Sequence, residues 1–137
     1  MRFVPMMINI ARAKGFAAYI GDGSNRWPAV HRLDAAVLYR LALESAPAGS
    51  RLLGAGDEGI PLREIAEVIG RQLSVLEVSI TAEAAAAHFG FLGAIAAIDI
   101  TSLYNTAQAS LATRELLGWQ PVQPRLVADL ENGHYFV

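Results

Sequence analysis

The glycine-rich stretch at residues 54–59 is the first place where residue types and spacing could do chemistry. Its glycines fit the pattern G-x-G-x-x-G, and Glu77 follows 18 residues after the last of them. A strand predicted at residues 51–53 and a helix predicted from Pro61 would complete the arrangement that binds the pyrophosphate of a dinucleotide. On spacing alone, Gly54, Gly56 and Gly59 are candidate cofactor-binding residues.

The charges in this stretch argue against a phosphate site. Asp57 and Glu58 occupy the two positions before the third glycine. Each carboxylate at about 5 Å from a phosphate would cost about 3 kcal/mol at an effective dielectric constant of about 20. Pro61 also removes an amide from the turn that should donate to the phosphate. We therefore interpret the stretch as a strand-turn-helix connection, with a minimal dinucleotide-binding unit as an alternative.

A second candidate site is the sequence Asn25-Arg26-Trp27 together with His31. An arginine beside a tryptophan can hold a phosphate or carboxylate through two hydrogen bonds while the indole stacks on a ring. The same neighbours can form a structural cation–π pair, with His31 hydrogen-bonded to the backbone. Arg26, Trp27 and His31 are therefore candidate substrate-binding residues, and the structural pairing is the alternative.

His88 and Phe91 share one face of a predicted helix, at a kink that Gly90 would allow. They could line a pocket, so both are further substrate-binding candidates; a histidine satisfied by its surroundings is the alternative. His31 and Asp34 have a spacing that could hold a metal ion, but two ligands make no closed site. The chain contains no cysteine, and we expect no metal site.

The elements that would position these residues follow from apolar periodicity and from glycine and proline breakers. Helices are predicted at residues 6–14, 34–44, 61–73, 81–96, 113–117 and 126–132, and strands at 16–20, 27–30, 51–53 and 76–80. Residues 99–110 are predicted to form a loop or a broken helix. At 137 residues the chain should form a single α/β domain, 1–137, with a few short strands and about five helices.

Composition narrows the classes of partner. The net charge of −2 argues against a nucleic-acid surface, which needs clustered cations. Glu83, His88 and Asp99 interrupt the longest apolar stretch, so no membrane span is expected. The N-terminus is too short and too broken by proline for a signal peptide. We expect a cytoplasmic protein.

Four motifs carry a resemblance to a known family. They are Gly21-Asp22-Gly23-Ser24-Asn25-Arg26-Trp27-Pro28-Ala29-Val30-His31, Leu38-Tyr39-Arg40-Leu41-Ala42-Leu43-Glu44, Gly56-Asp57-Glu58-Gly59-Ile60-Pro61-Leu62-Arg63-Glu64-Ile65-Ala66 and Thr113-Arg114-Glu115-Leu116-Leu117-Gly118-Trp119. Together they resemble the C-terminal portion of the atypical extended short-chain dehydrogenase/reductases, the NAD-dependent epimerase/dehydratase family. The resemblance spans almost the whole chain.

The resemblance implies an incomplete, Rossmann-type remnant. In that family this portion supplies the last strands of the nucleotide-binding sheet and a small helical substrate lobe, while NAD(P) binds to the other half. No cofactor is therefore expected on this chain. Members that bind nucleotide sugars place an arginine near Arg26 to meet a phosphate, with the register here shifted by about one residue. Relatives usually carry an acid just before the position of Asp34, where this chain has Arg32 and Leu33.

The catalytic pair of that family cannot be assembled here. Lys14 is the only lysine, and Ile10 stands four residues before it, so the Tyr-x-x-x-Lys dyad is absent. In that dyad the lysine lowers the tyrosine pKa, which lets the tyrosine act as general acid and base. We therefore expect no catalytic residue, and an oxidoreductase segment that is inactive alone.

A different class of protein remains open. The segment could be a standalone homo-oligomeric interaction module or a small-ligand-binding module without redox chemistry. A sheet lacking its first strands would leave an open edge and uncovered helix faces, and such surfaces usually find a partner. We therefore expect a homodimer or larger species, formed through the exposed sheet edge or helix faces.

Overall fold

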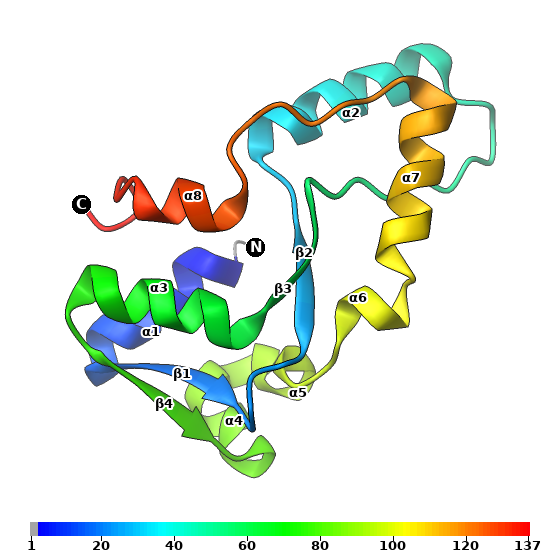
Figure 1. Cartoon of the computed structure of the whole chain (residues 1–137). Helices are drawn as coiled ribbons and strands as arrows, with labels where there is room; N and C mark the ends of the chain where they lie inside the picture. The colour runs from blue at the N-terminus through cyan, green and yellow to red at the C-terminus, as the bar shows by residue number, and fades with distance from the viewer. Residues whose placement is uncertain (1–2) are drawn as a thin grey trace.

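The computed structural model describes residues 3–137 and shows a mixed α/β fold (Figure 1). Within these residues, four short strands form two separate two-stranded sheets, with helices packed around them. The predicted α/β class with few short strands is thus confirmed.

The elements follow one another along the chain with few long connections. The strands are β1 (Phe16–Ile20), β2 (Arg26–Ala29), β3 (Asp57–Pro61) and β4 (Leu76–Ile80). The helices are α1 (Phe3–Lys14), α2 (Arg32–Ser45), α3 (Leu62–Leu73), α4 (Ala82–Phe89), the 3-10 turn η1 (Gly90–Leu92), α5 (Gly93–Ala96), α6 (Ile100–Leu103), α7 (Thr106–Leu117) and α8 (Leu126–Glu131).

The core lies around the parallel pair β1–β4. The register runs from Phe16 opposite Leu76 to Ile20 opposite Ile80. Helix α3 precedes β4 and buries its apolar stripe, which includes Leu62, Ile65 and Ile69, in the main hydrophobic core. Helices α1 and α3 lie together beside this sheet (Figure 1). The sequence periodicity therefore located the core helix correctly.

The second sheet pairs β2 with β3 in antiparallel orientation. Its register shifts between Trp27 and Ala29, where Pro28 has no amide to donate to a ladder. This pair leads from the core toward an outer arm formed by α2 and α7 (Figure 1). The expected irregular strand around Pro28 is thus present as β2.

The strand predicted at residues 51–53 is absent. Residues 51–56 run as irregular chain, and the strand begins only at Asp57. Side chains of α7 take the hydrogen bonds that a neighbouring strand would supply. The Leu53 amide donates to Thr113 Oγ1 at 2.9 Å, and the Ala55 amide donates to Ser110 Oγ at 3.3 Å.

Residues 99–110 were predicted to form a loop or a broken helix, and the structure shows the broken helix. It contains α6 and the first half of α7, and the predicted turn at 113–117 is only the end of α7. Thr106, Ser110 and Thr113 are buried, although such polar residues usually indicate solvent. They lie on one face of α7, and two of them bind the backbone of residues 51–56. The polar residues of this helix therefore face another segment of the chain instead of solvent.

The stretch Ala82–Leu103 is long and apolar enough to cross a membrane by length and composition, with a mean hydropathy of 1.5. Glu83, His88 and Asp99 therefore do not exclude it, contrary to the expectation from sequence. The fold divides the stretch into α4, η1, α5 and α6, and Gly90 ends α4 at a φ of 62°. About a third of the apolar window is buried.

Candidate functional site

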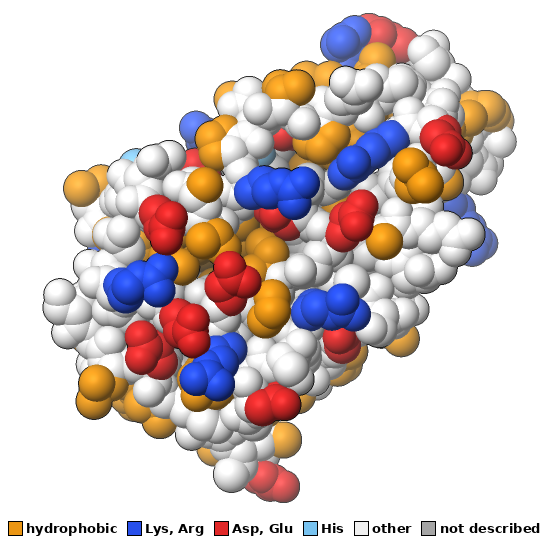
Figure 2. Space-filling model, viewed as in Figure 1, with side chains coloured by type: hydrophobic (Ala, Val, Ile, Leu, Met, Phe, Trp, Pro, Cys, Tyr) orange, Lys and Arg blue, Asp and Glu red, His pale blue; other side chains and the backbone are white. Residues whose placement is uncertain are grey.

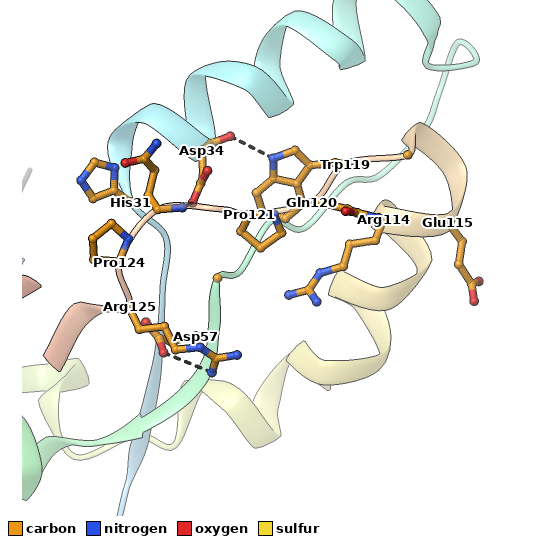
Figure 3. A pocket seen from close by; sticks show the side chains of 13 residues that line it. His31, Asp34, Asp57, Arg114, Glu115, Trp119, Gln120, Pro121, Pro124 and Arg125 are labelled. Carbon is orange, nitrogen blue, oxygen red and sulfur yellow. Dashed lines mark hydrogen bonds and ion pairs between the residues drawn. The ribbon is translucent and has the colours of Figure 1, made fainter. Parts of the chain in front are cut away.

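Three of the four sequence motifs meet around a cavity of about 520 Å³, which we call the Trp119 cavity (Figure 3). It lies between the start of α2, the approach to β3, the end of α7 and the segment 118–125. Its lining residues are His31, Asp34, Gly56, Asp57, Arg114, Glu115, Gly118, Trp119, Gln120, Pro121, Gln123, Pro124 and Arg125. Nine of these thirteen residues belong to the segment 114–125, and the other four come from two segments much earlier in the sequence.

Asp34 fastens the segment after Trp119 to the start of α2. Its carboxylate accepts hydrogen bonds from the Val122 and Gln123 amides, both at 3.0 Å. Its backbone carbonyl accepts from Trp119 Nε1 at 2.9 Å. Asp34 is buried, so its carboxylate relies on these amides as hydrogen-bond donors. The side chain therefore holds one wall of the cavity in place.

His31, rather than Asp34, is the N-cap of α2. Its Nδ1 accepts a hydrogen bond from the Leu33 amide at 3.2 Å. A neutral imidazole with an accepting Nδ1 carries its proton on Nε2. His31 therefore reaches the cavity as one of the sequence candidates, with Nε2 as a hydrogen-bond donor.

Two arginines add positive charge to the cavity. Arg114 donates to the Ala55 carbonyl at 2.8 Å, and its guanidinium lies 5.9 Å from the Trp119 ring centre. Arg125 pairs with Asp57 at 3.6 Å, while the Leu126 amide donates to the same carboxylate at 2.9 Å. Figure 3 shows the Arg114 guanidinium directed beneath Trp119, whereas Glu115 points away.

The chemistry that this cavity supports is binding rather than bond making. Its two central carboxylates already accept hydrogen bonds from backbone amides or an arginine. Arg114 Nε is buried without a hydrogen-bond partner, and His31, Gln120, Gln123 and Arg125 carry further side-chain donors in the lining. Pro121 and Pro124 offer apolar contact at the rim.

The Arg26–Trp27 candidates lie at the opposite end of β2 from His31. Arg26 Nε pairs with Asp99 at 3.3 Å and its Nη2 donates to Ser102 at 3.1 Å. Trp27 Nε1 donates to the Ile98 carbonyl, and the indole stacks on Phe3 at 4.4 Å between ring centres. Both side chains thus tie β2 to neighbouring segments.

His88 and Phe91 are not brought together with the other candidates. His88 is buried between the rings of Phe16 and Phe89, and Lys14 Nζ lies 3.4 Å from its Nδ1. Burial, and then the nearby Lys14 charge, lower the pKa of His88. Phe91 is 83% exposed on η1. The two residues therefore face different surroundings.

The glycine candidates lie in a different context from a dinucleotide loop. Residues 54–56 are irregular and lead into β3, so Gly59 stands within a strand. A Cβ on Gly54 would come within 2.2 Å of Leu38 Cδ2, and one on Gly59 within 2.6 Å of Thr101. Close packing of neighbouring side chains accounts for both glycines. Gly56 lines the Trp119 cavity.

The first turn of α3, where a phosphate would have to bind, is already occupied. The Leu62 amide donates to the Asn25 carbonyl at 2.9 Å, and the Arg63 amide donates to the Gly23 carbonyl at 3.1 Å. Backbone groups that point into another segment cannot also cradle an anion. The motif around Gly21–Asn25 thus caps α3.

The rest of the described surface offers fewer free groups for binding a ligand. A second cavity, of about 570 Å³, lies along α3 and is bordered by exposed charges that pair with one another, such as Arg63 with Glu67 and Arg71 with Glu131. In the view of Figure 2, acidic and basic side chains are interspersed over the visible face of the molecule. Among residues 3–137, no group of three His, Asp or Glu side chains could hold a metal ion.

Sequence reasoning missed most of the cavity. Arg114 and Trp119 lie in a motif that was recognised, but their local spacing gave no sign that they face α2. Trp119 is almost completely buried, and its partner Asp34 lies 85 residues earlier. A pairing at that separation leaves no periodic pattern in the sequence.

The fold is a small α/β unit, and the Trp119 cavity lies at its outer arm. Two curated proteins are similar to it. The uncharacterized protein C2A9.02 of Schizosaccharomyces pombe is 46% identical over 134 residues, which are 98% of this chain and 43% of that protein. The uncharacterized protein YLL056C of Saccharomyces cerevisiae is 44% identical over 132 residues, which are 96% of this chain and 42% of that protein.

The chain therefore spans about two fifths of the length of the curated relatives it matches. No protein-family model and no solved structure matches the chain.

Proposed function

We propose that this chain is the substrate-side lobe of an NAD(P)-dependent epimerase/dehydratase of the extended short-chain dehydrogenase/reductase type. In this proposal the lobe shapes the substrate site and supplies no redox chemistry. The cofactor and the Tyr-x-x-x-Lys dyad belong to the remaining part of such a protein, which would transfer hydride to or from a carbonyl or sugar carbon.

The observation that carries this proposal is the uncovered surface of α2. This helix of 14 residues has Asp34 as its only buried residue. Leu33, Val37, Tyr39 and Leu43 are exposed, Leu43 to 89%. Exposed apolar residues of this size on one helix indicate a covering partner. Since more than half of each curated relative lies outside the matched region, an additional lobe could provide that cover.

The contact between two of the resembling motifs supports the same proposal. The motif that ends at His31 continues into Asp34, and Asp34 binds Trp119 and the segment that follows it. The motifs therefore belong to one structural unit.

A chimera tests the proposal. The matched 134 residues of the S. pombe relative would be replaced by this chain, and NADH and NADPH binding would be measured by calorimetry for the relative, the chimera and this chain alone. We expect one cofactor per molecule for the relative and the chimera, and no binding by the chain alone. Absence of nucleotide binding by the relative, or stoichiometric binding by this chain alone, would contradict the proposal.

The alternative is a standalone ligand-binding or homo-oligomeric module, and the Trp119 cavity favours it. The cavity has the size of a small-molecule site and offers donors beside apolar walls. If this module acted alone, a ligand should bind the isolated chain and bind more weakly to Gln120→Ala, which changes an exposed residue of the lining, with the fold retained by circular dichroism.

A further inference from the structure

Strand β4 presents an unprotected edge. It pairs with β1 on one side, and no other strand of the described chain lies beside it (Figure 1). Its sequence, Leu76-Glu77-Val78-Ser79-Ile80, contains no proline and no lysine, and its pairing with β1 has no bulge. A proline, a lysine or a β-bulge on an edge strand is a common way for soluble proteins to prevent pairing with another chain. Leu76 is 76% exposed, so apolar surface also borders the edge.

The direction of the backbone groups on this edge follows from one hydrogen bond. The Gly21 amide donates to the Ile80 carbonyl at 3.0 Å, so Ile80 directs its backbone toward the β1 side. Successive residues of a strand alternate in this respect. Leu76 and Val78 therefore also face β1, and the amides and carbonyls of Glu77 and Ser79 face outward.

We propose that β4 pairs antiparallel with β4 of a second copy of this chain, about a two-fold axis through Val78. In this register Glu77 lies opposite Ser79 of the second copy, and the two residues exchange backbone hydrogen bonds on both sides of the axis. Leu76 lies opposite Ile80 of the second copy. Apolar residues then meet apolar residues, and each carboxylate meets a hydroxyl.

Charge and strand length favour the axis through Val78 over the axes through the adjacent residues. An axis through Glu77 would place two carboxylates directly opposite each other, which is unfavourable. An axis through Ser79 would leave Leu76 beyond the end of the paired strands. The Val78 axis pairs all five residues of β4. It is a self-complementary contact of the kind that two-fold dimers use. The pairing concerns a different surface from the Trp119 cavity and α2 and requires no cofactor, so its test is separate from that of the proposed function.

A single cysteine tests the axis, because the chain has no cysteine of its own. Val78 would form a non-hydrogen-bonded pair with its copy, with Cα atoms about 4.5 Å apart, which a disulfide can span. We expect Val78→Cys to form a covalent dimer under mild oxidation at least about tenfold faster than Leu43→Cys, whose side chain is 89% exposed on α2. Equal rates would overturn the proposal.

Two matched substitutions test the register. Ser79→Lys and Ser79→Glu both lose the hydrogen bond from Ser79 to the Gly21 carbonyl, so they share that structural cost. Lysine would face Glu77 of the second copy, whereas glutamate would repel it. Sedimentation from about 10 to 500 µM protein should give a dimerisation constant on the order of tenfold tighter for Ser79→Lys. A monomer for the unmodified chain throughout, or no difference between the two variants, would contradict the pairing.

Discussion

Trp119 and Asp34 lie 85 residues apart in sequence and are joined by a hydrogen bond of 2.9 Å from the indole nitrogen to the Asp34 carbonyl. The Asp34 carboxylate binds the two amides that follow Pro121. Together these contacts fix α2, the end of α7 and the wall of the Trp119 cavity. The binding surface of the outer arm depends on this one junction.

Asp34→Asn tests the junction. The substitution keeps the size of the side chain but presents an NH₂ group to one of the two amides, which leaves that amide without its acceptor. We expect the free energy of unfolding to fall by about 2 kcal/mol. Urea denaturation followed by tryptophan fluorescence measures it. Glu44→Gln, on the exposed end of the same helix, is the control and should change stability by less than about 0.5 kcal/mol.

Gly54 and Gly56 should differ in how well they tolerate substitution by alanine. Gly54→Ala places a methyl group against Leu38 and beside the Trp119 ring, so we expect a loss of about 1–3 kcal/mol. Gly56→Ala meets nothing closer than 3.7 Å and should be nearly neutral. Thermal unfolding of both variants compares them. Equal destabilisation would show that close packing at Gly54 is not what requires glycine there.

His88 should make stability pH-dependent in mildly acidic solution. Burial and then Lys14 lower its pKa from the ordinary value of 6.5, so the folded state binds fewer protons than the unfolded state. The stability that the neutral ring contributes is present above pH 6.5 and is lost as pH falls through the lowered pKa. His88→Gln should flatten this part of the stability curve relative to the unmodified chain.

The control for this pH dependence is His134→Gln, because His134 is exposed near the C-terminus. We expect that variant to retain the full slope in urea denaturation between about pH 5 and 7. A His88→Gln variant whose slope matches that of the unmodified chain would contradict the account of this histidine.

Arg26 and Asp99 should contribute unequally to the junction between β2 and α6. Asp99 is the N-cap of α6, and the Ser102 amide and Arg26 lower its pKa. Asp99→Ala should cost about 1 kcal/mol at neutral pH, and this difference should diminish below the ordinary pKa of 3.8. Arg26→Gln loses only a partly exposed pair and should cost less than Asp99→Ala. Chemical denaturation at two pH values distinguishes the two effects.

The elements that could be predicted from sequence are those whose signals are local. The apolar stripe of α3 and the alternation in β4 specify a helix and a strand within a few residues. The helix predicted from residue 81 begins there, because Thr81 is the N-cap of α4 and its hydroxyl accepts a hydrogen bond from the Ala84 amide. Such signals depend on neighbours along the chain, so one sequence is enough to detect them.

The remaining features depend on contacts between distant segments. Residues 51–53 have the composition of a strand, yet Ser110 and Thr113 of α7 satisfy the backbone around them. The predicted start of the helix at Asp34 places this residue in the first turn, as observed, but nothing local showed that His31 is the N-cap or that Asp34 binds residues 122 and 123. His31 was predicted as a site residue, but Arg114 and Trp119 join it only through tertiary packing.

Hydrogen exchange on α2 tests the central claim, that the outer arm of this lobe is completed by another part of a longer protein. Amide exchange would be compared between this chain and the chimera that carries it within the S. pombe relative. Because α2 buries only Asp34 in this chain, we expect its amides to exchange at least about tenfold more slowly in the chimera. Unchanged exchange along α2, with both proteins folded, would contradict the claim.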